Sequence, residues 1–167
     1  MTLKLLREIN PEYIAFCFDR KEPSFRVKLY EDYKANRGEM PDDLVPQIPY
    51  IKKLTDYLGI PRFDAKGFEA DDVIGTLAKF STKRKQEVVI VSGDKDFAQL
   101  ITDKVTMYDP MRENKYDLEG VVKKWGIESS QMIDYLALVG DASDNIPGVY
   151  GVGPKTCLLY TSPSPRD

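Results

Sequence analysis

The stretch 87–96, EVVIVSGDKD, is a β-branched apolar run that ends in Gly93 and Asp94. A short continuous apolar run bounded by a turn residue is typical of a buried strand in a parallel sheet. A second run, YIAFCFDR at 13–20, is apolar and aromatic and ends in Asp19. The two runs predict parallel strands, each followed by an aspartate at the carboxyl end, where α/β sheets bind ligands.

Helical patterns separate and follow these strands. We expect helices over 44–60, ending at Gly59, and over 72–85, and a short one over 97–101. Further strands are expected at 61–65 and 104–109, and helices over 117–126 and 129–140. Strands that alternate with helices predict an α/β domain, with a mostly parallel central sheet flanked by helices.

The bulk composition is that of one globular domain. The chain has 167 residues, of which 42% are apolar and 31% are charged. No apolar run reaches the roughly 20 residues of a membrane span, and the sequence shows no secretory signal pattern. The chain has two cysteines far apart in the sequence, which does not indicate a disulfide framework, so we expect a reducing, cytoplasmic setting. From the lack of a long apolar run we expect no membrane partner. The net charge of -3 argues against a surface coated for non-specific nucleic-acid binding.

The chain contains no histidine. This removes the usual general base near neutral pH and the commonest transition-metal ligand. A metal site must therefore be built from oxygen, which favours Mg²⁺, Mn²⁺ or Ca²⁺ over zinc.

Acidic residues gather in four places that could hold such a cation. A structural explanation exists for each place alone, because acids cap helices and aspartates in turns bond their own backbone. If the groups converge, they could hold two divalent ions about 3.5–4 Å apart. The four groups are Asp19; Glu69, Asp71 and Asp72 in GFEADD; Asp94 and Asp96 in SGDKD; and Asp141 and Asp144 in GDASDN.

Cations and aromatic rings alternate in SFRVKLYEDYKANR, residues 24–37. As one helix, this segment would place Arg26, Tyr30, Tyr33 and Arg37 along a stripe, with basic residues beside them. Such a stripe could hold phosphates, and a tyrosine could stack on an unpaired base. The alternative is an amphipathic helix whose rings pack on the core.

Glycines recur in IPGVYGVGPKT, residues 146–156, before an expected helix. Glycine lets the backbone approach a phosphate, and a helix N-terminus offers free N–H groups to it. The spacing is not that of a Walker A loop. The candidate DNA contacts here are Gly148, Gly151, Gly153, Lys155 and Thr156.

These motifs, in this order, resemble the 5′ nuclease domain of bacterial DNA polymerase I and the wider flap endonuclease and 5′–3′ exonuclease family. The resemblance implies a 5′ nuclease, PIN-like fold that cleaves DNA at 5′ ends, flaps, nicks and gaps during primer removal and repair. It implies two Mg²⁺ ions, with Mn²⁺ as a substitute, and K⁺ at a glycine hairpin. It is compatible with a monomer and with a polymerase domain in the intact protein.

The resemblance also assigns roles to individual residues. Lys34 and Arg37 match basic residues that contact the phosphate being cut, with Tyr33 beside them and Arg26 one helix face away. With Lys34 and Arg37, Asp19 and Asp94 complete the expected catalytic set. The implied first metal set is Asp19, Glu69, Asp71, Asp72 and Asp94, and the second is Asp96, Asp141 and Asp144.

The resemblance further implies boundaries. Residues 1–156 match part of the nuclease domain, with 140–156 as the start of a helix–three-turn–helix element. The family pattern begins with a strand ending in Asp-Gly that has no counterpart here. The segment 157–167 resembles nothing in the family and is expected to be an assembly artefact.

Two other functions stay open at this stage. A chain without one metal ligand could bind DNA and not cleave it. A haloacid-dehalogenase-type phosphatase would share Mg²⁺ and an α/β sheet, but it needs a second aspartate two positions after the first. Asp19 is followed by Arg20 and Lys21, which disfavours that chemistry.

Overall fold

The computed structural model describes residues 2–161, and the chain divides into two compact units. The first unit holds the residues up to Leu29 and the segment Arg37–Ile74. The second holds Tyr30–Asn36 and the residues from Gly75 onward. Helix α4 (Ala70–Lys83) therefore gives its first residues to one unit and the rest to the other.

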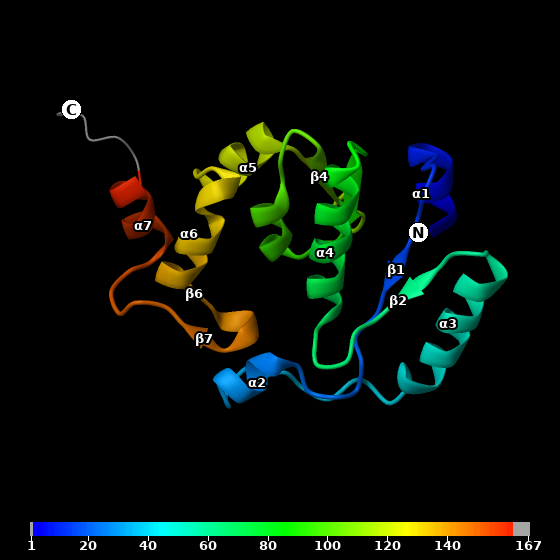
Figure 1. Cartoon of the computed structure of the whole chain (residues 1–167). Helices are drawn as coiled ribbons and strands as arrows, with labels where there is room; N and C mark the ends of the chain where they lie inside the picture. The colour runs from blue at the N-terminus through cyan, green and yellow to red at the C-terminus, as the bar shows by residue number, and fades with distance from the viewer. Residues whose placement is uncertain (1, 162–167) are drawn as a thin grey trace. The chain divides into compact units, whose positions relative to one another are not determined.

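The first unit is built around a short parallel strand pair. Strand β1 (Phe16–Cys17) pairs with β2 (Arg62–Phe63), as Figure 1 shows. The strands expected at 13–20 and 61–65 are present as the short strands β1 and β2. The helix expected over 44–60 is present as η1 (Val45–Gln47) followed by α3 (Ile48–Tyr57). The remaining elements are α1 (Thr2–Ile9) and α2 (Phe25–Leu29).

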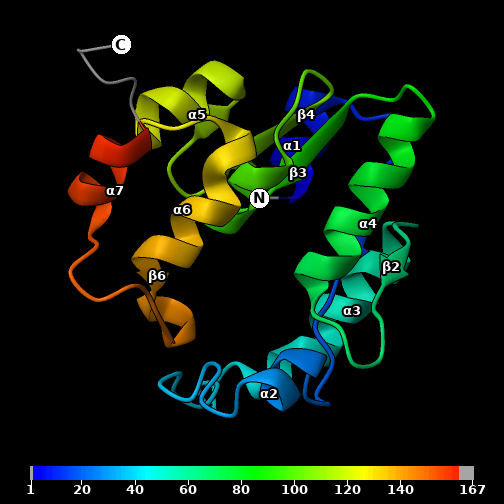
Figure 2. The same ribbon diagram turned by 60° about the vertical axis from the view of Figure 1, so that its left-hand side comes forward.

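The second unit contains a three-stranded mixed sheet. Strand β3 (Val88–Val91) runs parallel to β4 (Val105–Asp109), and β5 (Asn114–Tyr116) is antiparallel to β4 (Figure 2). Helices η2 (Lys95–Leu100), α5 (Leu118–Trp125), η3 (Ser129–Gln131) and α6 (Met132–Val139) accompany the sheet. Its core is apolar and includes Ile90, Phe97, Ile101, Met107, Val121 and Met132, all at most 3% exposed.

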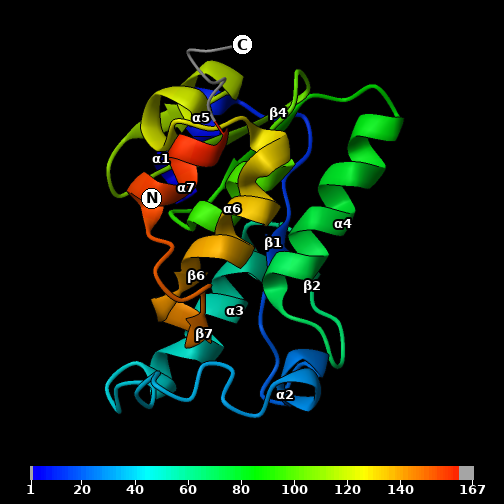
Figure 3. The same cartoon turned by 90° about the vertical axis from the view of Figure 1, so that its left-hand side faces the viewer.

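A glycine-bounded turn follows α6 in the second unit. Strand β6 (Gly140–Asp141) pairs antiparallel with β7 (Ile146–Pro147) across η4 (Ala142–Asp144), as Figure 3 shows. Helix α7 (Pro154–Thr161) follows, and Cys157 within it is buried. The expected tail at 157–167 thus begins inside a helix, while 162–167 lie outside the described residues. No described helix is long and apolar enough to cross a membrane.

The expected α/β class is confirmed, although its parallel pairs belong to separate small sheets. Strand β5 was not anticipated from the sequence. It follows a turn held by Asp109, which accepts hydrogen bonds from the Met111 N–H, the Arg112 N–H and the Arg112 guanidinium. Burial raises the pKa of Asp109, but these hydrogen bonds outweigh burial and lower it.

The single helix expected over 24–37 is wrong beyond Leu29. Helix α2 ends there, and Lys34 has a φ of 59°, in the left-handed region. The Lys34 N–H donates to the Asp144 carbonyl at 2.9 Å, which takes it out of any helical ladder. A long-range backbone bond has therefore overridden the local amphipathic pattern, and the predicted stripe does not form.

Candidate metal centre

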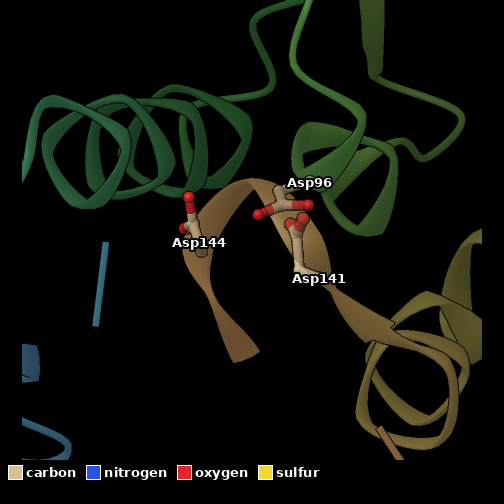
Figure 4. A group of neighbouring side chains, drawn as sticks. All are labelled: Asp96, Asp141 and Asp144. Atoms are coloured by element: carbon tan, nitrogen blue, oxygen red, sulfur yellow. The ribbon is translucent and has the colours of Figure 1, made fainter. Parts of the chain in front are cut away.

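Three aspartates of the second unit form a compact group, which we call the aspartate cluster: Asp96, Asp141 and Asp144. One carboxylate oxygen from each lies within 4.8 Å of the others. Figure 4 shows the three carboxylates grouped, with Asp96 next to Asp141. They come from η2, which follows β3, and from the turn after α6. This is the second metal set that the resemblance implied, and its members do lie together.

Local capping explains how the chain positions these side chains. Asp94 caps η2, because its Oδ1 accepts from the Asp96 N–H at 3.0 Å. Asp141 caps η4 in the same way, accepting from the Ser143 N–H at 2.9 Å. Asp94 and Asp141 therefore fix the starts of the two short helices that carry Asp96 and Asp144.

Two glycines allow the turn to close. A Cβ on Gly140 would lie 2.3 Å from the Gly148 nitrogen, and one on Gly148 would lie 2.4 Å from the Val139 carbonyl carbon. Both contacts are with backbone, so no side chain could be accommodated at either position. Gly148 thus has a packing reason to be glycine, whatever it contributes to DNA binding.

The aspartate cluster has more negative charge than its own hydrogen bonds neutralise. Burial raises the pKa of Asp96, and the nearby Asp94 carboxylate raises it further. Asp96 Oδ1 is buried and is the one such side-chain atom among residues 2–161 with no hydrogen bond. A buried anionic oxygen without a donor is costly, and a hard cation would satisfy it. The residues present therefore fit a divalent ion.

Lys95 enters the cluster, and the sequence reasoning missed it. Its Nζ donates to Asp141 Oδ2 at 2.7 Å and lies 3.7 Å from Asp96 Oδ1. Burial raises the pKa of Asp141, but the Lys95 and Ser143 hydrogen bonds outweigh this and lower it. The signal was available, since Lys95 stands between two expected ligands in GDKD.

The segment 30–36 is tied to the turn that carries Asp144. The Tyr33 hydroxyl donates to Asp144 Oδ2 at 3.0 Å, and Lys34 Nζ lies 3.9 Å from the same oxygen. Asn36 donates to the Ala142 carbonyl, and Asn145 donates to the Asp32 carbonyl. Lys34 thus lies beside the aspartate cluster, while the Tyr33 ring is only 9% exposed, which counts against the expected stacking on a base.

The first unit places its acids at the N-terminus of α4. This group, the acidic start of α4, consists of Asp19, Glu69, Asp71 and Asp72. Asp19 accepts from the Ala70 N–H at 2.7 Å, and Glu69 accepts from the Ser24 hydroxyl at 2.9 Å. Asp72 reaches back to the Glu69 N–H at 2.9 Å, as the third residue of a capping box does. Asp71 is exposed, and its charge adds to burial in raising the pKa of Cys17.

Arg26 completes this arrangement. Its guanidinium binds both oxygens of Asp72, at 2.7 and 2.8 Å. Arg26 was expected to contact DNA, and that role stays a prediction; in this structure its guanidinium pairs with Asp72, an expected metal ligand. Arg37 is exposed in the same unit.

Residues 148–153 form a second turn, between β7 and α7, which we call the glycine turn and whose tip is exposed. Tyr150 is fully exposed there, and Gly151 has a φ of 79° that favours glycine. Lys155 and Thr156 lie in the first turn of α7, with Lys155 exposed, and Gly153 directly precedes the helix. The arrangement leaves this turn open to a partner.

The fold is that of an α/β protein, and its aspartate cluster could hold a hard metal ion. Residues 1–126 match the family described as "5'-3' exonuclease, N-terminal resolvase-like domain". Residues 127–160 match "5'-3' exonuclease, C-terminal SAM fold". The chain belongs to the 5′–3′ exonuclease family.

Named relatives support the same assignment. The chain is 43% identical over 158 residues to a 5'-3' exonuclease of Aquifex aeolicus, covering 95% of this chain and 55% of the relative. It is 46% identical over 158 residues to DNA polymerase I of Pseudomonas aeruginosa, covering 95% of this chain and 17% of the polymerase. The chain thus spans about half of the exonuclease and under a fifth of the polymerase.

Solved structures agree with the fold. The T5 D15 protein co-crystallised with metal ions has a TM-score of 0.81 and 25% identity, covering 95% of this chain and 64% of that one. A variant of the bacteriophage T5 D15 flap endonuclease, in a pseudo-enzyme-product complex with DNA and metal ions, has a TM-score of 0.79 and 27% identity. That match covers 92% of this chain and 60% of the other.

Proposed function

We propose that this chain is part of a structure-specific 5′ nuclease that hydrolyses DNA phosphodiesters at 5′ ends, flaps and nicks. The observation that carries the proposal is the aspartate cluster, with its buried and unbonded Asp96 Oδ1, in a chain of the 5′–3′ exonuclease family. The family match favours this function over the phosphatase. Primer removal and DNA repair would be its setting, and a cytoplasmic location stays a prediction.

The metal sites follow from the donor set. Asp96, Asp141 and Asp144 would hold one divalent ion, and Asp19, Glu69, Asp71, Asp72 and Asp94 would hold the other. All donors are oxygen, so Mg²⁺ is the proposed ion, with Mn²⁺ as a substitute. Two such ions would supply a hydroxide nucleophile and stabilise an in-line displacement at phosphorus. K⁺ at the glycine turn is proposed from the family resemblance.

The basic residues would position the DNA. Lys34 lies 3.9 Å from Asp144, so its ammonium can meet a phosphate beside the aspartate cluster. Arg37 would contribute a second cation, and the turn 148–156 would approach the duplex backbone. A T5 relative in complex with DNA and metal ions supports DNA as the partner. A monomer, fused to a polymerase in the intact protein, is the assembly we propose.

Cleavage of a 5′-flap oligonucleotide tests this function. The 167-residue chain and a chimera are compared, the chimera carrying residues 1–156 in place of the matching part of the A. aeolicus exonuclease. We expect the chimera to release the flap with Mg²⁺ and not with chelator. A chimera that folds and gives no Mg²⁺-dependent product would reject the proposal. Flap binding without cleavage by the 167-residue chain alone would identify that chain as a binding fragment.

A further inference from the structure

The Lys95 ammonium lies against two of the three carboxylates of the aspartate cluster. Lys95 Nζ lies 2.7 Å from Asp141 Oδ2 and 3.7 Å from Asp96 Oδ1. The Asp141 side chain is 11% exposed and that of Lys95 is 37% exposed, so water screens the pair less at its Asp141 end than it screens a fully exposed ion pair. Both carboxylates belong to the set proposed to hold a divalent ion.

Charge balance makes the ammonium and the ion competitors. Three carboxylates within 4.8 Å repel one another, and Lys95 offsets one of their three charges. A Mg²⁺ ion would bring two charges and would need oxygens at about 2.0–2.1 Å. An ammonium hydrogen-bonded to Asp141 then becomes a like charge held against the ion. Binding of the ion to Asp141 Oδ2 must therefore displace Lys95 or work against it.

We propose that Lys95 is an internal counter-ion, which holds the aspartate cluster together without metal and competes with the divalent ion for Asp141. The proposal rests on the proposed function, since it concerns the metal site of that function. It makes Lys95 a positioning residue that lowers metal affinity and protects the fold when metal is scarce. An ordinary surface salt bridge would do neither, because such pairs contribute little.

Calorimetric titration of the 167-residue chain with Mg²⁺ and with Mn²⁺ tests the competition. Lys95→Met removes the ammonium and keeps most of the side-chain volume. We expect its metal affinity to rise about tenfold, which corresponds to about 1.4 kcal/mol. Lys115→Met is the matched control, because Lys115 is exposed on β5 and its loss changes the net charge equally. The control should bind as the parent does.

Thermal unfolding supplies a readout independent of affinity. In chelator, Lys95→Met should melt at a lower temperature than the parent, because the ammonium no longer offsets the repulsion between Asp96 and Asp141. In saturating Mg²⁺ this difference should vanish or reverse. A Lys95 that acts only as a structural salt bridge would give the same loss in both conditions, which would overturn the proposal.

Each remaining outcome also decides a question. Parent protein that binds no divalent ion contradicts the metal site of the proposed function, whereas parent binding with an unchanged Lys95→Met affinity contradicts only this inference. If Lys95→Met folds solely in Mg²⁺, the counter-ion role is supported directly. If it folds in neither condition, Lys95→Gln is titrated instead, and parent-like affinity in that variant overturns the proposal.

Discussion

The two acidic regions of the molecule differ in how the chain itself satisfies them. At the acidic start of α4, Asp19, Glu69 and Asp72 each accept a hydrogen bond from a protein donor. Asp72 also has a bidentate guanidinium partner in Arg26. In the aspartate cluster, Asp96 Oδ1 has no hydrogen bond, and Lys95 is shared between Asp96 and Asp141. The carboxylates at the acidic start of α4 are thus more fully neutralised by protein groups than those of the aspartate cluster.

This difference teaches that crowding of acids alone does not define a metal site. The acidic start of α4 is explained without an ion, through helix capping and one internal salt bridge. The aspartate cluster retains a buried oxygen, Asp96 Oδ1, that accepts no hydrogen bond and has only Lys95 Nζ at 3.7 Å, so a divalent ion would satisfy it better. We therefore expect the aspartate cluster to dominate metal binding by this chain, and the acidic start of α4 to contribute less until Arg26 is displaced.

The largest effect is expected from Asp141→Asn. This change removes the charge of a proposed ligand and leaves Lys95 with only its 3.7 Å contact to Asp96. Loss of groups that merely support a ligand costs about 10–100-fold in metal affinity, so loss of a ligand should cost at least about 100-fold. Calorimetric Mg²⁺ titration measures it, with Asp134→Asn as a control at an exposed site on α6. The comparison breaks if Asp72→Asn weakens Mg²⁺ binding more than Asp141→Asn does.

A smaller effect is expected from Arg26→Gln in the first unit. The bidentate pair with Asp72 is partly buried, with side chains 31% and 23% exposed. Removing it should lower the free energy of unfolding by roughly 2–3 kcal/mol, the range for charged hydrogen bonds. Chemical denaturation in chelator measures the loss.

Arg62→Gln is the matched control for that measurement. Arg62 pairs with Asp56, whose side chain is 55% exposed, and surface pairs contribute about 0–1 kcal/mol. Equal losses from the two variants would show that Arg26 does not neutralise Asp72 in any special way. The acidic start of α4 would then resemble the aspartate cluster in its need for a cation.

Sequence reasoning succeeded where the determinants are local. The apolar run 88–91 became β3, and the acidic capping pattern opened α4 at Ala70. The grouping of Asp96, Asp141 and Asp144 came from the family resemblance and not from local pattern, and the structure brings one carboxylate oxygen of each within 4.8 Å of the others. Whether the remaining expected ligands join one site stays a prediction, because they are divided between the two units.

It failed where distant residues decide. The helix expected over 24–37 was lost because the Lys34 N–H bonds Asp144, which lies 110 positions further along the chain. The stripe of Arg26, Tyr30, Tyr33 and Arg37 was lost because helix α2 ends at Leu29; Arg26, within that helix, pairs with Asp72. Amphipathic spacing describes a local preference of roughly 1 kcal/mol or less per residue, and one tertiary backbone hydrogen bond, worth about 0.5–1.5 kcal/mol, can outweigh it.

Tyr33→Phe separates two roles for one ring. The hydroxyl donates to buried Asp144, so its loss should lower the free energy of unfolding by about 1–2 kcal/mol and weaken Mg²⁺ binding. The ring itself is retained, so any base stacking should be unaffected. Fluorescence anisotropy with flap DNA in chelator measures DNA affinity apart from metal binding, and this affinity should be unchanged. Unchanged stability and Mg²⁺ affinity would contradict the role of the Tyr33 hydroxyl in orienting Asp144. Tyr50→Phe, at an exposed position, is the control.

The smallest effect is expected from Glu22→Gln, which tests an exposed ion pair of the first unit. Hydrogen bonds from Arg20 lower the pKa of Glu22 to about 2. Its stabilising contribution is therefore present above the ordinary carboxyl value of 4.5 and is lost as the pH falls toward about 2. At neutral pH and low salt, Glu22→Gln should therefore melt at a slightly lower temperature than the parent. The pair is exposed, so about 1 M salt, with a screening length of about 3 Å, should abolish this difference. The Arg26→Gln loss should persist in the same salt because Asp72 is partly buried. If salt removes the stability losses of Glu22→Gln and Arg26→Gln alike, Arg26 is only another surface charge. The acidic start of α4 would then not differ from the aspartate cluster by having an internal cation.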